Sequence, residues 1–414
     1  MTSPAHEHAA RANSAVPTGI ALTALDADFR EDPYPVLHRL RALDPVHRDT
    51  VFGRIILTRH DDVRDVLYDV RLFCDPRKAL PDTFAYRFLR DGDNEPSMLL
   101  MDEPEHRRLR GLVSRSFTPR AIARWQPRVR AVARRLVESL EEGDCDWMAA
   151  VASPLPTVVI AELLGIDSDR HADFKHWSDD AVLVGFNPSP GEDEKQRAEV
   201  AQAALDAFFG DEIVRRRQHL GEDLISDMLR AQDGDDRLTD AEIVMQCNLL
   251  LIAGNVTTTD LIGNGVKALA RHPDQQRILR EQPALIPNAV EETLRYDSPV
   301  TNSGRIASAD MQIGGVEIAR GENLSTSLAA ANRDPAVYPD PDRFDVTRAD
   351  THHHAFGGGR HLCLGAHLAR MEAAETFAAL LERFGRFEPG AGGHRYASTP
   401  SFRGLKEFWL TLSR

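Results

Sequence analysis

A long apolar helix in the middle of the chain constrains the fold more than any other stretch. Thr239 suits a helix N-cap, and Glu242 follows three residues later, the spacing of a capping box. The helical pattern continues to Ala270, and Pro273 ends it. A helix of about 30 residues is roughly 45 Å long. Because the stretch NLLLIAGNVTTTDLIGNGV is apolar on most faces, we expect this helix to cross the core of a large α-helical protein.

The same helix carries residues that form helices poorly. Its centre contains Gly254, three threonines, two asparagines and Asp260. Poor helix formers in a buried helix indicate either a ligand pressed against the helix or loose packing with threonines bonded to the backbone. The residues alone leave both interpretations open.

Weaker patterns surround this helix and predict a mainly α protein with small β-sheets. A flexible tail is expected over residues 1–20 and one domain over 21–414. Helices are predicted over 32–43, 104–117, 120–143 and 196–220, a short strand over 55–57 before another helix, hairpins with a Gly-Gly turn over 304–325, and a last strand over 403–412.

Composition narrows the classes of function. The chain has 50 Lys and Arg against 64 Asp and Glu, a net charge of −14, which disfavours bulk nucleic-acid binding. Its four cysteines are scattered without a CxxC pair, which indicates a reducing compartment. The N-terminus lacks the apolar segment of a signal peptide, and no run approaches the roughly 18 apolar residues of a membrane span. We therefore expect a cytoplasmic, monomeric protein that binds no membrane.

One cysteine, Cys363, stands in the glycine-rich stretch HAFGGGRHLCLGAHLAR, just before a predicted helix. A helix N-terminus stabilises a thiolate, and glycines let the backbone approach a flat group closely. A lone thiolate suits a ligand to a metal that something else already holds. Other interpretations stay open: zinc bound by His361, Cys363 and His367 with the histidines of 352–354, a phosphate loop without its GK[ST], a nucleophilic Cys363 with His361 as base, or a glycine-rich turn around a buried cysteine.

The stretch FGGGRHLCLG resembles the haem-binding signature of cytochrome P450. Three further segments follow the family order: EETLR with a Glu-x-x-Arg pair, AGNVTTTD in place of the oxygen-binding helix, and the meander of residues 331–348. The resemblance extends from Asp32 to the end of the chain and is to the soluble bacterial class. It implies the cytochrome P450 fold, in which the long helix lies over the haem and the cysteine loop leads into a helix.

The resemblance implies roles for individual residues toward a haem b cofactor. Cys363 is expected to ligate the haem iron as a thiolate, which favours O–O cleavage. Phe356 is expected to shield that ligand. The residues expected to contact the haem are His106, Arg110, Arg305, Phe356, His361, Cys363, Gly365 and Ala253, of which His106, Arg110, Arg305 and His361 match the family's contacts to the two propionates.

A second set of residues is expected to support the fold rather than the chemistry. Glu292 and Arg295 match the family's Glu-x-x-Arg pair, for which we expect a buried network with the meander through Arg333 or a backbone carbonyl. This pair is expected to serve structure and haem incorporation.

The long helix departs from the family pattern Ala-Gly-x-acid-Thr-Thr, because Val256 stands at the position of the acid. In the family the acid and the alcohol route protons to dioxygen, and valine cannot do so. We expect Thr257, Thr258 and Asn255 to form the catalytic set. Three explanations stay open for the missing acid. Water held by Asn255 and Thr257 suffices, or Asp260 substitutes, or a substrate group delivers the proton or the reaction is not ordinary monooxygenation. For Asp260 the alternative is a role in helix packing or a salt bridge.

The resemblance therefore implies a haem-thiolate monooxygenase that uses O2 to hydroxylate or epoxidise a medium-sized, apolar or partly oxygenated small molecule, such as a terpenoid, steroid, polyketide or aromatic metabolite. Alternatives are a P450 with non-standard oxidation (peroxygenase, desaturation or phenol coupling) and a haem protein that binds ligands without turnover. The expected substrate-pocket residues are Leu183, Phe186, Val300, Thr301, Asn302 and Phe402.

Electrons are expected from an external ferredoxin and its NAD(P)H-dependent ferredoxin reductase. An acidic ferredoxin would meet arginines on the thiolate side of the haem. These are Arg107, Arg108, Arg115, Arg120, Arg360 and Arg370.

Overall fold

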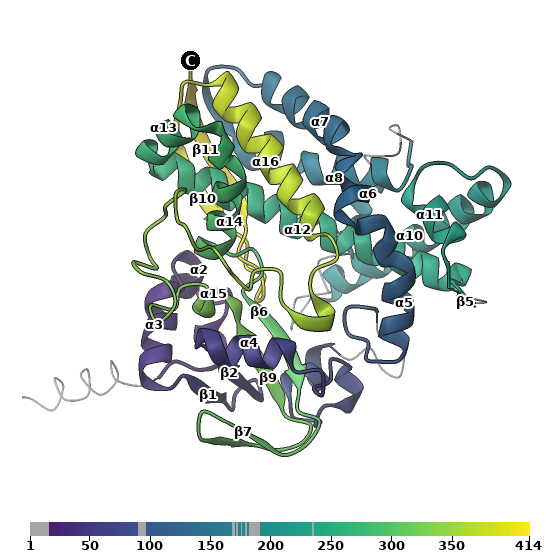
Figure 1. Ribbon diagram of the computed structural model, residues 1–414, viewed down its shortest axis with the longest axis vertical. Helices are drawn as coiled ribbons and strands as arrows, with labels where there is room; N and C mark the ends of the chain where they lie inside the picture. Colours follow the sequence, from purple (N-terminus) through teal and green to yellow (C-terminus); the bar gives the residue numbers. More distant parts are fainter. Residues whose placement is uncertain are drawn as a thin grey trace, which may run out of the picture.

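The computed structural model describes residues 16–89, 97–167, 170, 173–174, 176–178, 180–181, 191–233 and 236–414. It has a helical part and a smaller part built around a sheet, with the chain passing between the two several times (Figure 1). The helices are α2 (Ala27–Glu31), α3 (Tyr34–Leu43), α4 (His60–Tyr68), α5 (Glu105–Val113), α6 (Pro119–Ala123), α7 (Gln126–Glu138), α8 (Pro154–Leu163), α10 (Glu192–Gln218), α11 (Leu224–Arg230), α12 (Asp240–Arg271), α13 (Pro273–Glu281), α14 (Ile286–Tyr296), α15 (Leu328–Ala331) and α16 (Ala366–Arg383).

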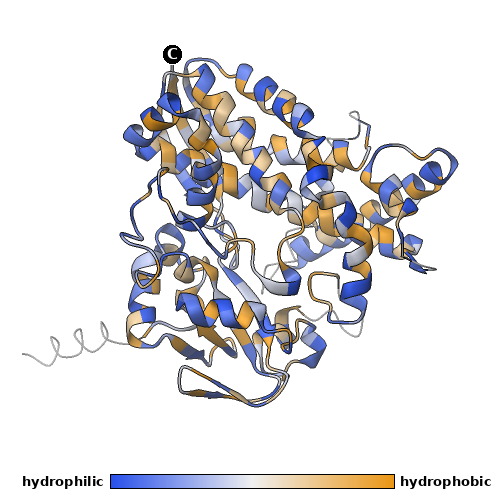
Figure 2. Cartoon of the chain, viewed as in Figure 1, coloured by the Kyte–Doolittle hydropathy of each residue, from blue (hydrophilic) through white to orange (hydrophobic). Residues whose placement is uncertain are grey.

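The predicted central helix is α12, and the capping box forms as expected. Thr239 Oγ1 accepts a hydrogen bond from the Glu242 N–H at 3.2 Å, and Glu242 Oε2 accepts one from the Thr239 N–H at 2.8 Å. The helix packs against α8, α10, α14 and α16, so helices cover several of its faces. Outer helices such as α7 alternate hydrophobic and hydrophilic residues, as the need for one buried face requires (Figure 2).

Four small sheets accompany the helices. The largest has the strand order β1-β2-β9-β6, in which β2 and β9 are parallel and the other pairs antiparallel. A second sheet has the order β10-β11-β3, and β4-β5 and β7-β8 are two-stranded. The strands are β1 (Val46–Asp49), β2 (Arg54–Leu57), β3 (Gly143–Asp146), β4 (Gln232–Asp233), β5 (Asp236–Arg237), β6 (Asn302–Ile306), β7 (Met311–Ile313), β8 (Val316–Ile318), β9 (Asn323–Ser327), β10 (Arg386–Tyr396) and β11 (Leu405–Ser413).

Short turns of helix connect these elements. They are η1 (Gly19–Leu22), η2 (Pro76–Lys78), η3 (Ala85–Leu89), η4 (Ser114–Phe117), η5 (Met148–Ala152), η7 (Pro283–Leu285) and η8 (Gly359–His361). The last of these, η8, lies in the glycine loop before α16 and contacts α4.

Two details differ from the sequence predictions. The helix predicted over 120–143 is divided into α6 and α7, because the chain turns at Arg124 and Trp125 and Pro127 starts a new helix. The strands β1, β3 and β10 were not predicted. β1 and β3 have only four residues each and lack a clear alternating pattern, and β10 contains Pro389 and three glycines, which weaken the signal of a strand.

The N-terminal prediction was also too broad. Thr18 Oγ1 and the Gly19 N–H donate to Asp49 Oδ1 at 2.7 and 3.0 Å, so the chain is fixed before residue 20. Residues 1–15 lie outside the described part, and the division into one tail and one domain stays a prediction. Within the described residues, none of the helices combines the length and the apolar character that crossing a bilayer requires.

Candidate active site

The loop between η8 and α16 presents Cys363 at the N-terminal end of α16. The Cys363 N–H donates to the Phe356 carbonyl oxygen at 2.9 Å, which closes the loop, and Gly365 caps the helix. The cysteine side chain is accessible. Protein atoms close around this accessible side chain desolvate the thiolate and raise the pKa of the thiol, while the Gly365 N–H and the charges of Arg110 and Arg370 act in the opposite direction. The fold therefore offers one thiol with donors and cations placed to favour its thiolate.

The glycines before the cysteine have a steric reason. Gly359 has φ +65°, and a Cβ there would lie 2.5 Å from the Leu67 carbonyl oxygen of α4. A Cβ on Gly358 would lie 2.7 Å from a ring carbon of Tyr68. Side chains at these positions would push the loop off α4, so the glycines hold the cysteine loop close to the sheet-containing part of the molecule.

Phe356 lies on the α16 side of the same loop. The Arg370 guanidinium carbon stands 4.5 Å from the centre of the Phe356 ring, and Arg370 donates to Glu291 of α14 at 2.6 and 2.8 Å. Burial alone would raise the pKa of Glu291, but hydrogen bonds from His353 and Arg370 lower it to about 2. The Phe356 ring is thus held by a charged pair between α14 and α16.

Two histidines expected to contact the haem are stacked on each other. The rings of His106 from α5 and His361 lie 4.1 Å apart, and the Nε2 atom of each is buried without a hydrogen-bond partner. Burial, together with Arg110 and Arg360 nearby, lowers the pKa of His106 to about 4. Burial and the same surroundings of positive charge lower the pKa of His361 to about 2. The two Nε2 atoms are therefore available for hydrogen bonds with a ligand, and arginines lie nearby.

Two arginines complete this cationic group. Arg305 of β6 is buried, and within the described residues its guanidinium bonds only to Ser303 and to backbone carbonyls, among them that of Gly358. Arg110 donates to the Leu362 carbonyl oxygen, and its charge acts on Cys363. Since neither arginine has a carboxylate partner in the described chain, the group fits two external carboxylates, such as the propionates of haem.

We expected Arg360 on a docking surface, but its guanidinium instead faces inward and donates to the Leu72 carbonyl oxygen. Its side chain is only 17% exposed. The sequence prediction went wrong because a glycine loop gives no periodicity from which to judge the direction of a side chain.

The face of α12 that carries Ala253 is accessible, although the helix is otherwise largely buried. Ala253 is exposed and Val256 and Thr257 are partly exposed, whereas Leu251 and Asn255 are buried. The Thr257 hydroxyl donates to the Ala253 carbonyl oxygen at 2.8 Å. Because the hydroxyl hydrogen is bonded to the backbone, the Thr257 oxygen is free only to accept a hydrogen bond from another donor.

Asn255 and Thr258, which we expected in the catalytic set, point elsewhere. Asn255 Oδ1 accepts from Thr157 of α8 at 3.0 Å, and its Nδ2 donates to Ser178 at 3.1 Å, in a buried network. Thr258 is also buried. Successive residues of a helix are about 100° apart, so these two leave the face of Ala253 and Thr257. The geometry corrects the expectation: Asn255 serves helix packing, and Thr257 is the hydroxyl on the accessible face.

Glu292 and Arg295 form a fully buried pair. Arg295 donates to both carboxylate oxygens at 2.7 and 2.8 Å, and it also reaches carbonyl oxygens of the meander. The expected link through backbone carbonyls therefore forms, but the further cation in this network is Arg348, 3.2 Å from Glu292, and not Arg333. Arg333 instead lies 3.3 Å from the centre of the Tyr34 ring. Arg348 is the last residue of the meander in the sequence. Only the folded structure shows that the meander folds back and brings Arg348 to Glu292.

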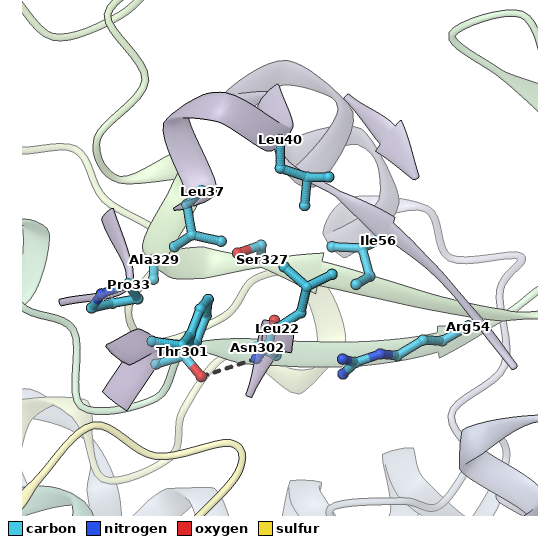
Figure 3. A pocket seen from close by; sticks show the side chains of 11 residues that line it. Leu22, Pro33, Leu37, Leu40, Arg54, Ile56, Thr301, Asn302, Ser327 and Ala329 are labelled. Atoms are coloured by element: carbon cyan, nitrogen blue, oxygen red, sulfur yellow. Dashed lines mark hydrogen bonds between the residues drawn. The ribbon is translucent and has the colours of Figure 1, made fainter. Parts of the chain in front are cut away.

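The expected pocket residues fall into three groups. Val300 and Phe402 form an isolated β-bridge, which joins the segment before β6 to the segment before β11. Thr301 and Asn302 instead line a cavity of about 20 Å³, between the N-terminal helices and the sheet (Figure 3). That volume holds about one water molecule and no substrate. Leu183 and Phe186 lie outside the described residues.

Strand alternation explains the misplacement of Asn302. On β6, Arg305 is three positions after Asn302, so their side chains point to opposite faces. When Arg305 faces the glycine loop, Asn302 faces Leu22, Leu37 and Ile56 (Figure 3).

The zinc interpretation of the cysteine loop finds no support in the geometry. Within the described part of the chain, the group of side chains with metal-ligand spacing is Cys74, Asp102 and His361, which contains neither Cys363 nor His367. Asp102 already accepts from the Cys74 N–H at 2.7 Å and from Lys78 at 3.0 Å. This group shares His361 with the cluster of His106, His361 and Arg305, so Cys74 and Asp102 line one side of that cluster.

Comparison with known proteins gives the class. The sequence model of the family described as cytochrome P450 matches residues 181–395. The chain is 43% identical over 357 residues to the vitamin D(3) 25-hydroxylase of Pseudonocardia autotrophica, covering 85% of this chain and 86% of that protein. It is 38% identical over 407 residues to the cytochrome P450 monooxygenase PikC of Streptomyces venezuelae, covering 95% and 94%.

Solved structures agree. The crystal structure of CYP109E1 from Bacillus megaterium in complex with testosterone has a TM-score of 0.82 and 33% identity, and covers 92% of this chain and 99% of that chain. The protein belongs to the cytochrome P450 family. It has the cytochrome P450 fold, it is an oxidoreductase of the monooxygenase type, and its cofactor is haem b.

Proposed function

We propose that this P450 hydroxylates a medium-sized, largely apolar small molecule of the steroid or macrolide kind, with Cys363 as the ligand of the haem iron. One observation carries the assignment of the site: an accessible thiol at the N-terminus of α16 lies beside a cluster of donors without carboxylate partners in the described chain. When bound, the haem supplies the activation of O2, and a thiolate ligand favours O–O cleavage.

The residues of the chain hold the cofactor by its charged edge. His106, His361, Arg110 and Arg305 would bond to the propionates, since their polar atoms converge and lack acid partners. Propionate binding would satisfy the two buried Nε2 atoms if each histidine presents a hydrogen there. Phe356, held by Arg370 and Glu291, would screen the sulfur from water and so limit the hydrogen bonds that water donates to it.

On the opposite side, α12 would line the reaction space with small and apolar groups. Ala253 leaves room for a flat cofactor, and Val256 and Thr257 stand one turn further along. Thr257, whose hydrogen is bonded to the Ala253 carbonyl, would accept a hydrogen bond from water and so keep a proton source near O2.

The substrate class is inferred from the relatives and from the pocket wall. The named relatives include a vitamin D(3) hydroxylase and PikC, and one solved neighbour holds testosterone. Val300 and Phe402, which are bridged to each other, would give the wall an apolar surface. Apolar walls with few polar groups are typical of sites for such ligands.

The electron donor is proposed to be a ferredoxin that docks near α5 and α6. Arg107, Arg115 and Arg120 are exposed there, and of these Arg107 pairs with Glu103 at the surface. Arg108 and Arg370 are less available, since they pair with Asp236 and Glu242, and with Glu291. The rate of electron transfer from reduced ferredoxin to this P450 tests the docking site. A rate that falls steeply with salt, and is lower again in the Arg115→Glu variant, would support it.

A titration of the ferric holoenzyme tests the substrate class. Vitamin D3, testosterone, a 14-membered macrolide and a small aromatic acid would be added while the Soret band is followed. We expect saturable shifts for the steroid or macrolide compounds and a loss of affinity in the Phe402→Ala variant. Shifts with the aromatic acid alone would contradict the substrate class but leave Cys363 as ligand.

A second proposal is peroxide-driven oxidation, one of the non-standard reactions named above, which the valine at position 256 favours. It predicts that hydrogen peroxide supports product formation as well as the electron-transfer system does. Product formation only with electrons from NAD(P)H would exclude it. The cytoplasmic location and the monomeric state stay predictions.

A further inference from the structure

Asp260 of α12 is a buried acid with no partner. Its residue is 6% exposed, and among the described residues it has neither a hydrogen bond nor an ion pair. A carboxylate in such a place normally pairs with a cation or stays protonated. Burial raises the pKa of Asp260 to about 8, so the group is a neutral acid with a proton to give at neutral pH.

The carboxyl of Asp260 packs against the backbone of Gly404 and leaves no room there for a side chain. A Cβ on Gly404 would lie 1.7 Å from Asp260 Oδ1, so any other residue at position 404 would displace the acid. Gly404 directly precedes β11, and two residues earlier Phe402 bridges to Val300. The carboxyl is therefore pressed against the segment that forms the proposed pocket wall.

The charged side chains near Asp260 bond to other residues and not to its carboxyl. Arg403, beside Gly404, pairs with Asp297 and bonds to Tyr396 at 2.9 Å. Lys267, further along α12, bonds to Tyr396 as well. Neither cation contributes to the pKa of Asp260, which burial alone raises. The acid is thus isolated from the charge network at this end of the helix.

Its place on the helix connects it to Thr257. Asp260 follows Thr257 by three residues and Val256 by four, so it is about 60° and about 40° from them around the axis. Residues at these spacings have Cβ atoms about 5–6 Å apart. Because a helical side chain leans toward the N-terminus, the carboxyl of Asp260 is expected on the side of the turn that holds Val256 and Thr257.

A second unused group lies on the other side of the acid. Asn264 donates through Nδ2 to the carbonyl oxygens of Arg403 and Asp297 at 2.7 and 3.1 Å, and its Oδ1 is buried without a partner. Asn264 follows Asp260 by four residues and packs against the same stretch, 403–404. An acceptor one turn away would orient a protonated carboxyl when the acid is not donating toward Thr257.

We propose that Asp260 is the proton donor for Thr257 in this chain, in place of the acid that the family pattern has at position 256. The proposal rests on the monooxygenase function proposed above. Hydroxylation consumes RH, O2, two electrons and two protons and yields ROH and H2O. The O–H bond of Asp260 breaks, its proton passes through water bonded to Thr257 to the oxygen being reduced, and solvent returns a proton to the carboxylate. The ferredoxin system supplies the electrons.

The first test needs no substrate. Infrared difference spectra of the resting holoenzyme in H2O and D2O are recorded for the wild type, Asp260→Asn and the control Asp240→Asn. Asp240 lies on the same helix and pairs with Arg217. We expect a protonated-carboxyl band at neutral pH that shifts in D2O and is lost in Asp260→Asn but not in Asp240→Asn. A spectrum that Asp260→Asn leaves unchanged would overturn the proposal.

The second test measures how electrons are used. With testosterone as the probe, product and hydrogen peroxide are measured per NADPH consumed, and peroxide is also measured without substrate. We expect Asp260→Asn to divert electrons to peroxide, with about tenfold less product per NADPH. Its carbon monoxide spectrum and testosterone affinity should be unchanged. Val256→Glu added to Asp260→Asn should restore coupling, because it returns an acid to the neighbouring position.

Two results would overturn the role in proton delivery. One is unchanged peroxide release in Asp260→Asn, both with the probe and without it. The other is a loss of coupling that comes together with a loss of probe affinity or of the thiolate spectrum, which marks Asp260 as structural. An absent thiolate spectrum in the wild type would instead refute the proposed function itself.

Discussion

At the scale of single residues, the site is defined by polar groups that the described chain leaves unsatisfied. The stacked His106 and His361 each bury an Nε2 atom without a partner, and Arg305 is buried without an acid. Buried donors in this state destabilise a fold by about 1–3 kcal/mol each unless a ligand completes them. The haem propionates are of the right charge and chemistry to do so.

His361→Ala is expected to weaken haem retention by about 10- to 100-fold, since it removes one bond to a charged group. The rate of haem transfer to excess apomyoglobin measures this. His352→Ala serves as the control, because His352 is exposed and pairs only with Asp350. Equal transfer rates for both variants would show that His361 does not hold the cofactor.

Thr257→Ala is expected to uncouple electron consumption from product formation, because it removes the acceptor that holds water on the accessible face of α12. Thr257→Ser keeps the hydroxyl and should stay coupled. Product and peroxide per NADPH give the measurement. Full coupling in Thr257→Ala would remove the hydroxyl from the proposed proton route.

At the scale of elements, α14 and the meander are joined through Glu292. Its carboxylate meets Arg295 and Arg348 and accepts from the Asp345 N–H at 2.9 Å. Glu292 and Arg295 are buried and Arg348 is nearly so. Removing the negative charge of Glu292 therefore leaves the two arginines without a compensating charge. The network fixes the segment that leads to the cysteine loop.

Glu292→Gln is expected to destabilise the protein by about 3–5 kcal/mol, as is typical when one partner of a buried ion pair is removed. Urea unfolding of the holoenzyme measures the change. Glu281→Gln on α13 is the control, since its pair with Arg277 is exposed and should change stability by about 0.5 kcal/mol or less. A similar stability for both variants would contradict the structural role of the pair.

The same elements show what the sequence can predict. The capping box and the apolar period of α12 are local, and the helix begins and ends within a residue of the prediction. The directions of Asn255, Asn302 and Arg360 are not local, because neighbours distant in sequence decide them: Thr157, Leu22 and Leu72. Likewise, Arg348 rather than Arg333 joins the Glu292 network because the meander folds back on itself. The residues of the signature could be identified from the sequence, but their partners could not.

At the scale of the whole molecule, stability should depend on pH through buried acids. The pKa of Asp260 is raised to about 8 in the folded protein, so between about pH 4 and about pH 8 the folded state holds a proton that the unfolded state has lost. Its contribution therefore weakens the fold as the pH rises through that window, by up to about 1.4 kcal/mol per pH unit.

Asp260→Asn is accordingly expected to gain stability over the wild type as the pH is raised from about 5 to about 8. Urea unfolding at both pH values, with Asp240→Asn alongside, measures the difference. A gain that is the same at both pH values would show that Asp260 is not a buried neutral acid.

The central claim is that Cys363 binds the haem iron as a thiolate, and the carbon monoxide difference spectrum of the reduced holoenzyme tests it most directly. The wild type should give the strongly red-shifted Soret band of a thiolate-ligated haem, and Cys363→His should bind haem but lose that band. A wild-type spectrum without the red-shifted band, or a Cys363→His variant that keeps it, would contradict the account.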